Sequence, residues 1–230
     1  MNNSKVINSN ALRVCAVIPF YNEKETITTI INDTLDYVQF VFAVNDGSDD
    51  GFSIEAMNQS EIKLINLDRN YGKGKALSIG FEAAVSAEFD FVVTLDADLQ
   101  HDPKYIPKLI EGLQSSDIVI GNRLKNLKGM PIQRRLSNKL TSFFLTVKTS
   151  QNILDSQCGY RAYKSEVLKS VRTNFSGFEA ESEILIKAAK KGFKIGFIDI
   201  PTIYGSEKSK MRPVQAIVGF LRVLFSNSAS

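Results

Sequence analysis

Apolar and polar positions follow a regular order along the first half of the chain. Short apolar runs rich in Val, Ile and Phe are typical of strands that are buried on both faces. The segments between them repeat apolar residues every three or four positions, which predicts amphipathic helices. This alternation predicts an α/β fold, with a mostly parallel sheet covered by helices on both faces. The expected strands are 13–19, 39–45, 62–67, 89–95 and 116–123, and the expected helices are 23–38, a short one after 51, 74–87 and 103–113.

The second half of the chain loses this rhythm. A basic, polar stretch is followed by a run that predicts an antiparallel strand, then by two helices and a last strand. Gly192 is expected to end the second helix. We therefore expect one mixed α/β domain with an elaborated C-terminal half. In order, these segments are 122–148, 157–164, 165–171, 179–191 and 193–201.

The composition allows one sizeable folded domain without a membrane span. The chain has 230 residues and is 43% hydrophobic, but no stretch reaches the roughly 18 to 20 apolar residues of a spanning helix. Cys15 and Cys158 are far apart in the sequence, which suits a reducing compartment. The net charge of +3 is too small to indicate a nucleic-acid partner. We expect a disordered tail at 1–12, the main domain at 13–212, and a basic amphipathic helix at 213–230 that can lie on a membrane surface.

Acidic side chains follow several of the predicted strands. Asp96, Asp98 and Gln100 occupy every second position after the strand at 89–95. Neighbouring like charges would repel each other, so a positive group is expected between the two carboxylates. Oxygen ligands in this pattern favour Mg²⁺ or Mn²⁺, which completes its shell with substrate phosphates and water. Glu23 and Asp46 follow two other strands and should lie at the same edge of the sheet.

Two other kinds of site are excluded by spacing. DGSDDG resembles the start of a calcium-binding EF-hand loop, but its twelfth position is Met57 instead of Glu. YGKGKAL resembles a dinucleotide-binding turn, but its third glycine position is Leu77. The glycines are therefore expected to form a tight turn into a helix.

Several motifs, in their order and spacing, resemble glycosyltransferase family 2, which has the GT-A fold. They are VIPFYNEKETI, VNDGSDDG, NYGKGKAL and TLDADLQHDP. Later segments such as RRLSNKL, DSQCGYRAY and IPTIYGSEKSKMRP resemble the branch that contains dolichyl-phosphate mannosyltransferase and related polyprenyl-phosphate sugar transferases. The resemblance covers about residues 13–213. It implies a nucleotide-diphosphate sugar donor of the GDP-mannose or UDP-glucose type, Mg²⁺ or Mn²⁺, and an inverting transfer to a polyprenyl or dolichyl phosphate.

The resemblance also implies roles for particular residues. Those expected at the nucleotide sugar are Pro19, Tyr21, Glu23, Asp46, Lys75 and Asp96, with Glu181 and Lys210 toward the sugar. Those expected at the metal are Asp96, Asp98 and Gln100, and those at the acceptor phosphate are Arg123, Arg134 and Ser137. Asp98, Arg134 and Asp155 are the expected catalytic residues, and Arg161 falls in a segment that lines the reaction centre. The residues alone do not separate Glu181 from Glu179 and Glu183.

Positive charge is concentrated in two acid-free stretches. No Asp or Glu lies between Ile118 and Leu154 or after Glu207, and both stretches contain several Lys and Arg residues. Such a run is usually a solvated face. Here apolar residues are interleaved with the charges, which favours an anionic membrane surface. In the first stretch these are Leu140, Phe143, Phe144 and Leu145. We expect the protein to attach peripherally to the cytoplasmic face of a membrane. The sequence leaves open whether a separate membrane subunit exists.

Three other functions stay open at this point. A family-2 enzyme could add its sugar to a hydroxyl group of a sugar or protein, with Asp155 as the general base. A nucleotidyltransferase could share the fold, although PFYNEKE stands where such enzymes usually carry a Gly-rich loop. The third alternative is a subunit that binds nucleotide sugars without catalysing a reaction. His101 and Cys158 are expected to pack in the interior, although His101 could also join the metal site.

Overall fold

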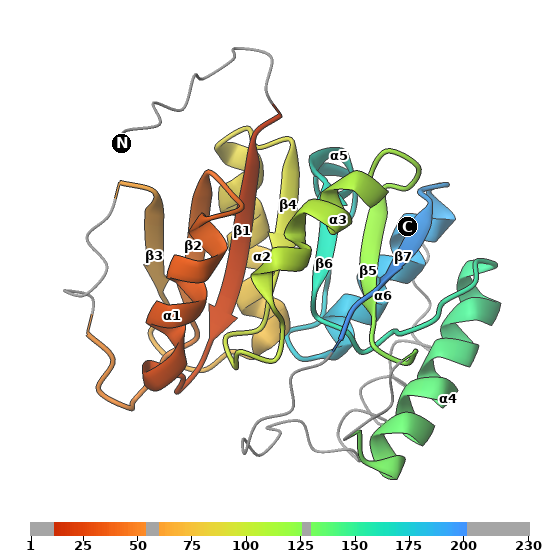
Figure 1. The fold of residues 1–230 in the computed structure, drawn as a ribbon, viewed down its shortest axis with the longest axis horizontal. Helices are drawn as coiled ribbons and strands as arrows, with labels where there is room; N and C mark the ends of the chain where they lie inside the picture. Colours follow the sequence, from red (N-terminus) through yellow and green to blue (C-terminus); the bar gives the residue numbers. More distant parts are fainter. Residues whose placement is uncertain (1–11, 54–59, 126–129, 202–230) are drawn as a thin grey trace.

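The fold is built on one seven-stranded sheet (Figure 1). The computed structural model describes residues 12–53, 60–125 and 130–201. Across the sheet the strands lie in the order β3-β2-β1-β4-β6-β5-β7. Their bounds are β1 Val14–Phe20, β2 Phe40–Asn45, β3 Ile62–Asn66, β4 Phe91–Thr94, β5 Ile118–Asn122, β6 Arg161–Lys164 and β7 Ile195–Asp199.

The strand pairing agrees with the prediction from the sequence. β1 pairs in parallel with β2 and β4, β2 pairs in parallel with β3, and β5 does so with β7. β6 runs antiparallel to both of its neighbours, β4 and β5. The carboxyl ends of β1, β2 and β4 therefore meet at one edge of the sheet, at the bottom of Figure 1.

Helices cover both faces of the sheet. α1 and α3 lie on one face, and α2, α5 and α6 lie on the other (Figure 1). α4 lies at the margin of the molecule, where it contacts α6. The bounds are α1 Lys24–Leu35, α2 Lys73–Ser86, η2 Pro103–Tyr105, α3 Ile106–Gly112, α4 Ile132–Thr149, α5 Ser165–Ser170 and α6 Glu179–Lys190.

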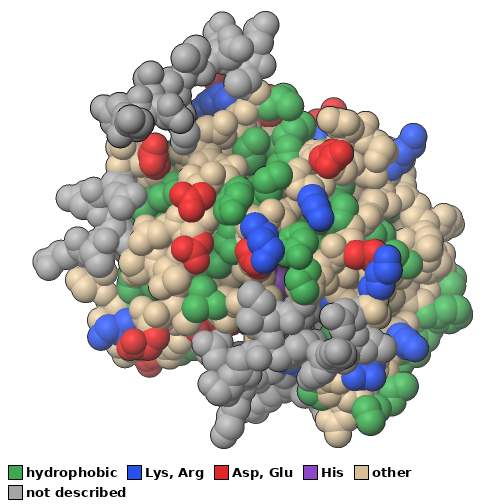
Figure 2. Space-filling model, in the orientation of Figure 1, with side chains coloured by type: hydrophobic (Ala, Val, Ile, Leu, Met, Phe, Trp, Pro, Cys, Tyr) green, Lys and Arg blue, Asp and Glu red, His purple; other side chains and the backbone are tan. Residues whose placement is uncertain are grey.

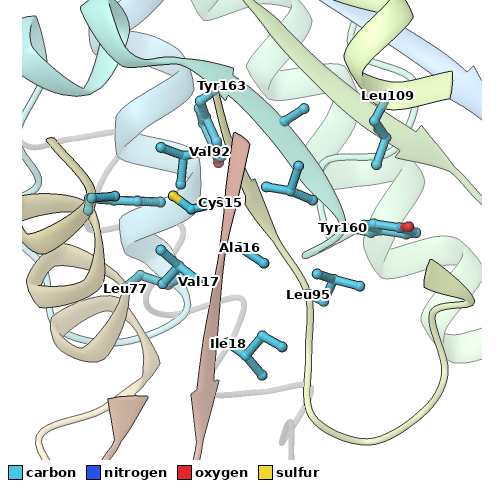
Figure 3. Packing of buried hydrophobic residues seen from close by; sticks show 14 of the residues in the cluster. Cys15, Ala16, Val17, Ile18, Leu77, Val92, Leu95, Leu109, Tyr160 and Tyr163 are labelled. Atoms are coloured by element: carbon cyan, nitrogen blue, oxygen red, sulfur yellow. The ribbon is translucent and has the colours of Figure 1, made fainter. Parts of the chain in front are cut away.

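The core is centred on β1. The side chains of Cys15 to Ile18 are fully buried. Cys15 and Val17 lie on the side of Leu77 of α2, and Ala16 and Ile18 lie on the other side of β1, toward Leu95 (Figure 3). Gly80 of α2 lies against the side chain of Val17, and a β-carbon at this position would clash with it. A glycine at position 80 thus allows α2 to pack closely on the sheet.

Most of the predicted elements are present within one or two residues. The helix expected at 103–113 begins as the 3₁₀ turn η2, and the side chain of Asp102 caps it by accepting from the backbone N–H of Lys104 at 3.0 Å. Much of the basic stretch forms the single helix α4. The short helix expected after residue 51, most of the tail at 1–12 and the helix at 213–230 fall outside the described residues. In the described part of the chain, every helix is too short or too polar to cross a membrane.

Candidate active site

A cavity of about 700 Å³ lies where the carboxyl ends of β1, β2 and β4 meet. Such an edge is the usual binding site of an open α/β sheet, because the loops that follow the strands converge there. Most of the residues predicted for the donor, metal and acceptor line this cavity. They are Pro19, Tyr21, Glu23, Asp46, Asp96, Asp98, Gln100, Arg123 and Arg134.

The other predicted residues in the described part of the chain do not line the cavity. Asp155 and Glu181 lie behind its wall and contact residues that line it. Lys75 is exposed at the start of α2, and Lys73, two residues earlier, lines the cavity in its place. Ser137 is partly buried on α4 and accepts a hydrogen bond from Gln157 at 3.0 Å. Lys210 is outside the described residues.

Asp46 fixes the loop that leads into α2. Its two carboxylate oxygens accept the backbone N–H groups of Tyr71 and Gly72, at 2.8 and 2.9 Å. Gly72 has a φ of 101°, a conformation that other residues rarely adopt. Burial raises the pKa of Asp46 above its usual value, while the two backbone hydrogen bonds lower it. Asp46 therefore shapes the cavity wall whether or not it also contacts a nucleoside.

The positive group expected beside Asp96 is Lys73. Its Nζ lies 2.6 Å from Oδ1 of Asp96 and 3.1 Å from Oε2 of Glu181. The sequence analysis expected a divalent cation as the positive group between the two carboxylates, and the structure places a lysine from outside the motif beside Asp96 as well. Lys73 was missed because it reaches the site from a different element, the first turn of α2.

The two aspartates of the motif differ in their electrostatic surroundings. Burial favours the neutral form of Asp96, but the charge of Lys73 lowers the pKa of Asp96 well below its usual value. Burial and the nearby charge of Asp96 raise the pKa of Asp98 to about 6. The negative charge of Asp98 is therefore the one that lacks a close positive partner in the described part of the chain.

The donor set suits a divalent cation that is shared with a substrate. Among the described residues, no group of three or more His, Cys, Asp or Glu side chains could hold a metal by itself. Asp98 lines the cavity beside Gln100, whose backbone N–H it accepts at 3.1 Å. Mg²⁺ and Mn²⁺ commonly take one or two carboxylates and obtain their other ligands from phosphates and water. The residues present fit that arrangement and do not fit a closed structural site.

The structure separates two of the three glutamates at the start of α6, Glu181 and Glu183. Glu183 accepts from the Thr173 hydroxyl at 2.6 Å and the backbone N–H of Asn174 at 2.7 Å, away from the cavity. Glu181 is buried beneath the site, where it pairs with Lys73. Of these two, only Glu181 is connected to the cavity wall.

Arg123 is held in place by a buried carboxylate. Its Nε and Nη2 donate to the two oxygens of Asp155 at 2.9 and 3.0 Å, and Asn138 of α4 donates to the same carboxylate at 2.6 Å. Burial favours the neutral form of Asp155, but the charge and hydrogen bonds of Arg123 hold the pKa of Asp155 below its usual value. The side chain of Asp155 is completely buried. It is therefore well placed to orient Arg123.

Asn138 is a cavity residue that the sequence analysis missed. Arg134 and Asn138 both line the cavity, and they are four residues apart on α4. Residues at that spacing lie on the same side of a helix, so the helical period could have identified Asn138 in preference to Ser137. Phe178, at the start of α6, is a second such residue; it lines the cavity and is 40% exposed.

Three other predicted residues are structural. His101 and Cys158 are buried, and the His101 ring stacks on Tyr160 with a centroid distance of 5.1 Å. Burial lowers the pKa of His101 to about 4, which keeps the ring neutral. Arg161 is fully buried and donates to the backbone carbonyls of Cys158 and Ser156. The expected packing of His101 and Cys158 is confirmed, and Arg161 braces the segment that carries Asp155.

Two solved structures with a similar fold are 3-phosphoglycerate synthases named for a glucosyl and a mannosyl group. Glucosyl-3-phosphoglycerate synthase from Mycobacterium tuberculosis, solved with Mn²⁺, uridine diphosphate and phosphoglyceric acid, superimposes with a TM-score of 0.72 at 19% identity, over 93% of this chain and 79% of that chain. Mannosyl-3-phosphoglycerate synthase from Rubrobacter xylanophilus gives a TM-score of 0.74 at 17% identity, over 93% of this chain and 72% of that chain. The fold is therefore GT-A, as the resemblance implied.

Two proteins with related sequences are named as sugar transferases that act on a polyprenyl phosphate. The UDP-N-acetylglucosamine–dolichyl-phosphate N-acetylglucosaminyltransferase of Methanococcus voltae is 31% identical over 89% of this chain and 90% of its own length. The undecaprenyl-phosphate mannosyltransferase of Micrococcus luteus is 26% identical over 90% of each chain. The family model described as glycosyl transferase family 2 matches residues 15–172. The chain therefore belongs to glycosyltransferase family 2 and resembles its polyprenyl-phosphate sugar transferases.

Proposed function

We propose that this glycosyltransferase moves a sugar from a UDP- or GDP-sugar to a polyprenyl phosphate at a membrane surface, with inversion and with Mg²⁺ or Mn²⁺. The observation that carries this proposal is the pairing of Asp155 with Arg123. A hydroxyl acceptor needs a general base, and the carboxylate suggested for that role is buried and held by a guanidinium group. The cavity wall presents Arg123 and Arg134 instead.

A phosphate acceptor suits this arrangement chemically. A phosphate monoester is already anionic at neutral pH, so it can attack without a base. One of its oxygens would form a bond to the anomeric carbon while the bond from that carbon to the donor diphosphate breaks. A single displacement of this kind inverts the configuration of that carbon. The principal barrier is repulsion between two phosphate-bearing substrates, which Arg123 and Arg134 would reduce.

The donor side needs positive charge for the leaving diphosphate. Asp98, with Asp96 and Gln100 beside it, would hold the cation. The Mn²⁺ in the structure of the Mycobacterium tuberculosis enzyme of the same fold supports a divalent cation. When bound, the cation supplies Lewis-acid stabilisation of the leaving group. Lys73 keeps Asp96 ionised and adds a fixed positive charge at the same wall of the cavity.

The names of two relatives support the lipid acceptor. The proteins from Methanococcus voltae and Micrococcus luteus are named for transfer to dolichyl phosphate and undecaprenyl phosphate, respectively. They differ in the sugar that they transfer, so they do not select a donor for this chain. The proposal therefore commits to the acceptor class and leaves the sugar to experiment.

A panel assay tests the proposed function. The full chain is incubated with UDP- and GDP-sugars, Mg²⁺ or Mn²⁺, and either a polyprenyl phosphate or soluble sugar and peptide acceptors. We expect a polyprenyl phosphosugar, identified by mass, whose anomeric configuration is opposite to that of the donor. Efficient transfer to a soluble hydroxyl acceptor, with none to polyprenyl phosphate, would overturn the acceptor assignment.

Replacing Arg134 by Ala should selectively weaken acceptor binding. A charge-assisted hydrogen bond to phosphate contributes about 1.5–3 kcal/mol, so the apparent KM for polyprenyl phosphate should rise about ten- to a hundredfold. Donor binding, measured by calorimetry, should change little. Arg134→Lys should restore only part of the loss, because lysine keeps the charge but cannot donate two parallel hydrogen bonds. An unchanged KM for the lipid in Arg134→Ala would remove Arg134 from the acceptor site.

A further inference from the structure

Glu181 is a buried carboxylate that lies between two positive side chains. Its side chain is 9% exposed, its Oε2 is 3.1 Å from Nζ of Lys73, and its Oε1 is 3.5 Å from Nε of Arg161. The second distance is longer than the usual range of a hydrogen bond, and Nε of Arg161 donates to the backbone carbonyl of Cys158 at 2.7 Å instead. Oε1 has no hydrogen-bond partner among the described residues. Lys73 is therefore the closest charged partner of Glu181 that the structure describes.

Tight backbone packing holds Glu181 beside Lys73. Lys73 is the first residue of α2, and Glu181 lies in the first turn of α6. The two helix starts approach closely at Gly74, where an added β-carbon would lie 2.4 Å from that of Ala180. Only a residue without a β-carbon allows this approach. The separation between the ammonium group and the carboxylate is therefore set by the backbone as well as by the side chains.

Lys73 is also held by a second carboxylate, that of Asp96. Its Nζ is 2.6 Å from Oδ1 of Asp96, so the ammonium group bridges Asp96 and Glu181. The side chain of Asp96 is 31% exposed and lines the cavity, whereas that of Glu181 lies behind the cavity wall. On the face shown in Figure 2, acidic and basic side chains are interspersed, and exposed charges are screened by water and salt. The charge of Lys73 is therefore balanced locally, by one carboxylate that faces the cavity and one that does not.

The two carboxylates allow Asp96 to be shared with a divalent cation. Asp96 belongs to the oxygen ligands that fit Mg²⁺ or Mn²⁺, and an ammonium group on the same carboxylate competes with such a cation and repels it. The side chain of Lys73 is only 16% exposed. With Asp96 as its single partner, Lys73 would give up that carboxylate only by leaving its own charge largely buried and unpaired. Glu181 removes this penalty, because it offers the ammonium group a partner behind the cavity wall.

We propose that Glu181 is a positioning residue that retains the ammonium group of Lys73 at the cavity wall, so that Asp96 can be shared with a divalent cation. The inference rests on the cation of the proposed function and does not depend on the acceptor. It gives Glu181 a role through Lys73, in place of the contact with the sugar that the family resemblance implies. Retained in this way, Lys73 remains a fixed positive charge for the leaving diphosphate.

Two variants with opposite expected effects test the proposal. The apparent dissociation constant of Mn²⁺ for the full chain is measured by electron paramagnetic resonance, with an excess of UDP in one series and of GDP in the other. Glu181→Gln should weaken Mn²⁺ binding about tenfold, because Asp96 is then the only close carboxylate left to Lys73. Lys73→Met should bind Mn²⁺ at least as tightly as the wild type, because the ammonium group no longer competes for Asp96.

The double variant gives the sharpest comparison. Adding Lys73→Met to Glu181→Gln should return the dissociation constant of Mn²⁺ to the wild-type value or below, because the competing ammonium group is removed. A merely structural role of Glu181 would not produce this recovery, since the second substitution takes away a further contact. Unchanged Mn²⁺ binding in Glu181→Gln would overturn the proposal, and so would a double variant that binds Mn²⁺ as weakly as Glu181→Gln.

Glu183→Gln is the matched control. It makes the same exchange at another buried carboxylate of α6 that pairs with a lysine, Lys187, at 2.9 Å. Its Mn²⁺ affinity should equal that of the wild type, and thermal unfolding midpoints show whether each variant is folded. If Glu181→Gln does not fold, Lys73→Met still decides the matter, because Mn²⁺ binding weaker than that of the wild type in this variant overturns the proposal.

Further outcomes separate this proposal from its alternatives. If Glu181 contacts the sugar directly, Glu181→Gln should weaken the binding of nucleotide sugar relative to nucleoside diphosphate and leave Mn²⁺ binding unchanged. If the wild type binds no Mn²⁺ with either nucleotide, the cation of the proposed function is wrong, and this proposal is wrong with it. If the Mn²⁺ results hold while transfer to polyprenyl phosphate fails, the acceptor assignment is wrong and the role of Glu181 stands.

Discussion

Replacing Asp98 by Asn should lower turnover by at least about three orders of magnitude, equivalent to about 4 kcal/mol of transition-state stabilisation. Asp98 lines the cavity, and its charge has no close positive partner in the described part of the chain. The amide has the same shape but loses the charge that would hold a divalent cation. Initial rates of transfer with saturating donor and acceptor measure the effect.

Two controls separate lost cation binding from lost folding. The thermal unfolding midpoint of Asp98→Asn should equal or exceed that of the wild type, because the substitution removes a partly buried negative charge near Asp96. Calorimetry of nucleoside diphosphate binding should show tightening by Mn²⁺ in the wild type and little tightening in the variant. Full wild-type activity in excess chelator would contradict the metal assignment, and so would a fully active Asp98→Asn.

Replacing Asp155 by Asn should impair acceptor use and destabilise the fold at the same time. The substitution leaves the Arg123 guanidinium, which is 13% exposed, without its carboxylate, and breaking a largely buried pair from one side costs up to about 3–5 kcal/mol. The apparent KM for lipid phosphate should rise about tenfold or more, because Arg123 loses its orientation. Denaturant unfolding and steady-state kinetics measure the two effects.

The same variant distinguishes a positioning residue from a general base. If Asp155 were a general base, the Asp155→Asn variant would lose kcat with little change in stability. The pH dependence of its rate would also no longer show the ionisation of that base. If Asp155 positions Arg123, adding Arg123→Gln to Asp155→Asn should restore part of the lost stability, because both charges of the pair are then removed. If the double variant is no more stable than the single one, the pair does not explain the role of Asp155.

The fold could be predicted from the sequence because its signals are local. Buried strands such as 14–20 are continuous apolar runs, and the helices between them repeat apolar residues with the helical period. The antiparallel β6 also follows from its place after the regular alternation ends. The strand order could not be deduced, because it depends on which apolar faces pack together in space.

The candidate site could be predicted only in part, because several of its contacts join distant segments. Asp96, Asp98 and Gln100 were recognisable as one motif within five residues. The ion pair between Lys73 and Asp96 joins the start of α2 to the end of β4, and no local pattern reports such a contact. The burial of Asp155 under α4 was equally invisible, so its role as a base could not be judged from the sequence.

The inner side of α4 is attached to residues 155–156 largely by hydrogen bonds, such as those from Asn138 to Asp155 and from the backbone N–H of Ser156 to Ser142. The response of an unfolding step to denaturant and temperature scales with the surface that the step exposes. Detaching α4 breaks hydrogen bonds, and on the helix itself it uncovers mainly polar side chains, with Leu145 as the apolar exception. Its opening should therefore have a small m-value and a small heat-capacity change. In native-state hydrogen exchange, the amides of α4 should form a group that exchanges by local opening, well before the buried strands of the sheet.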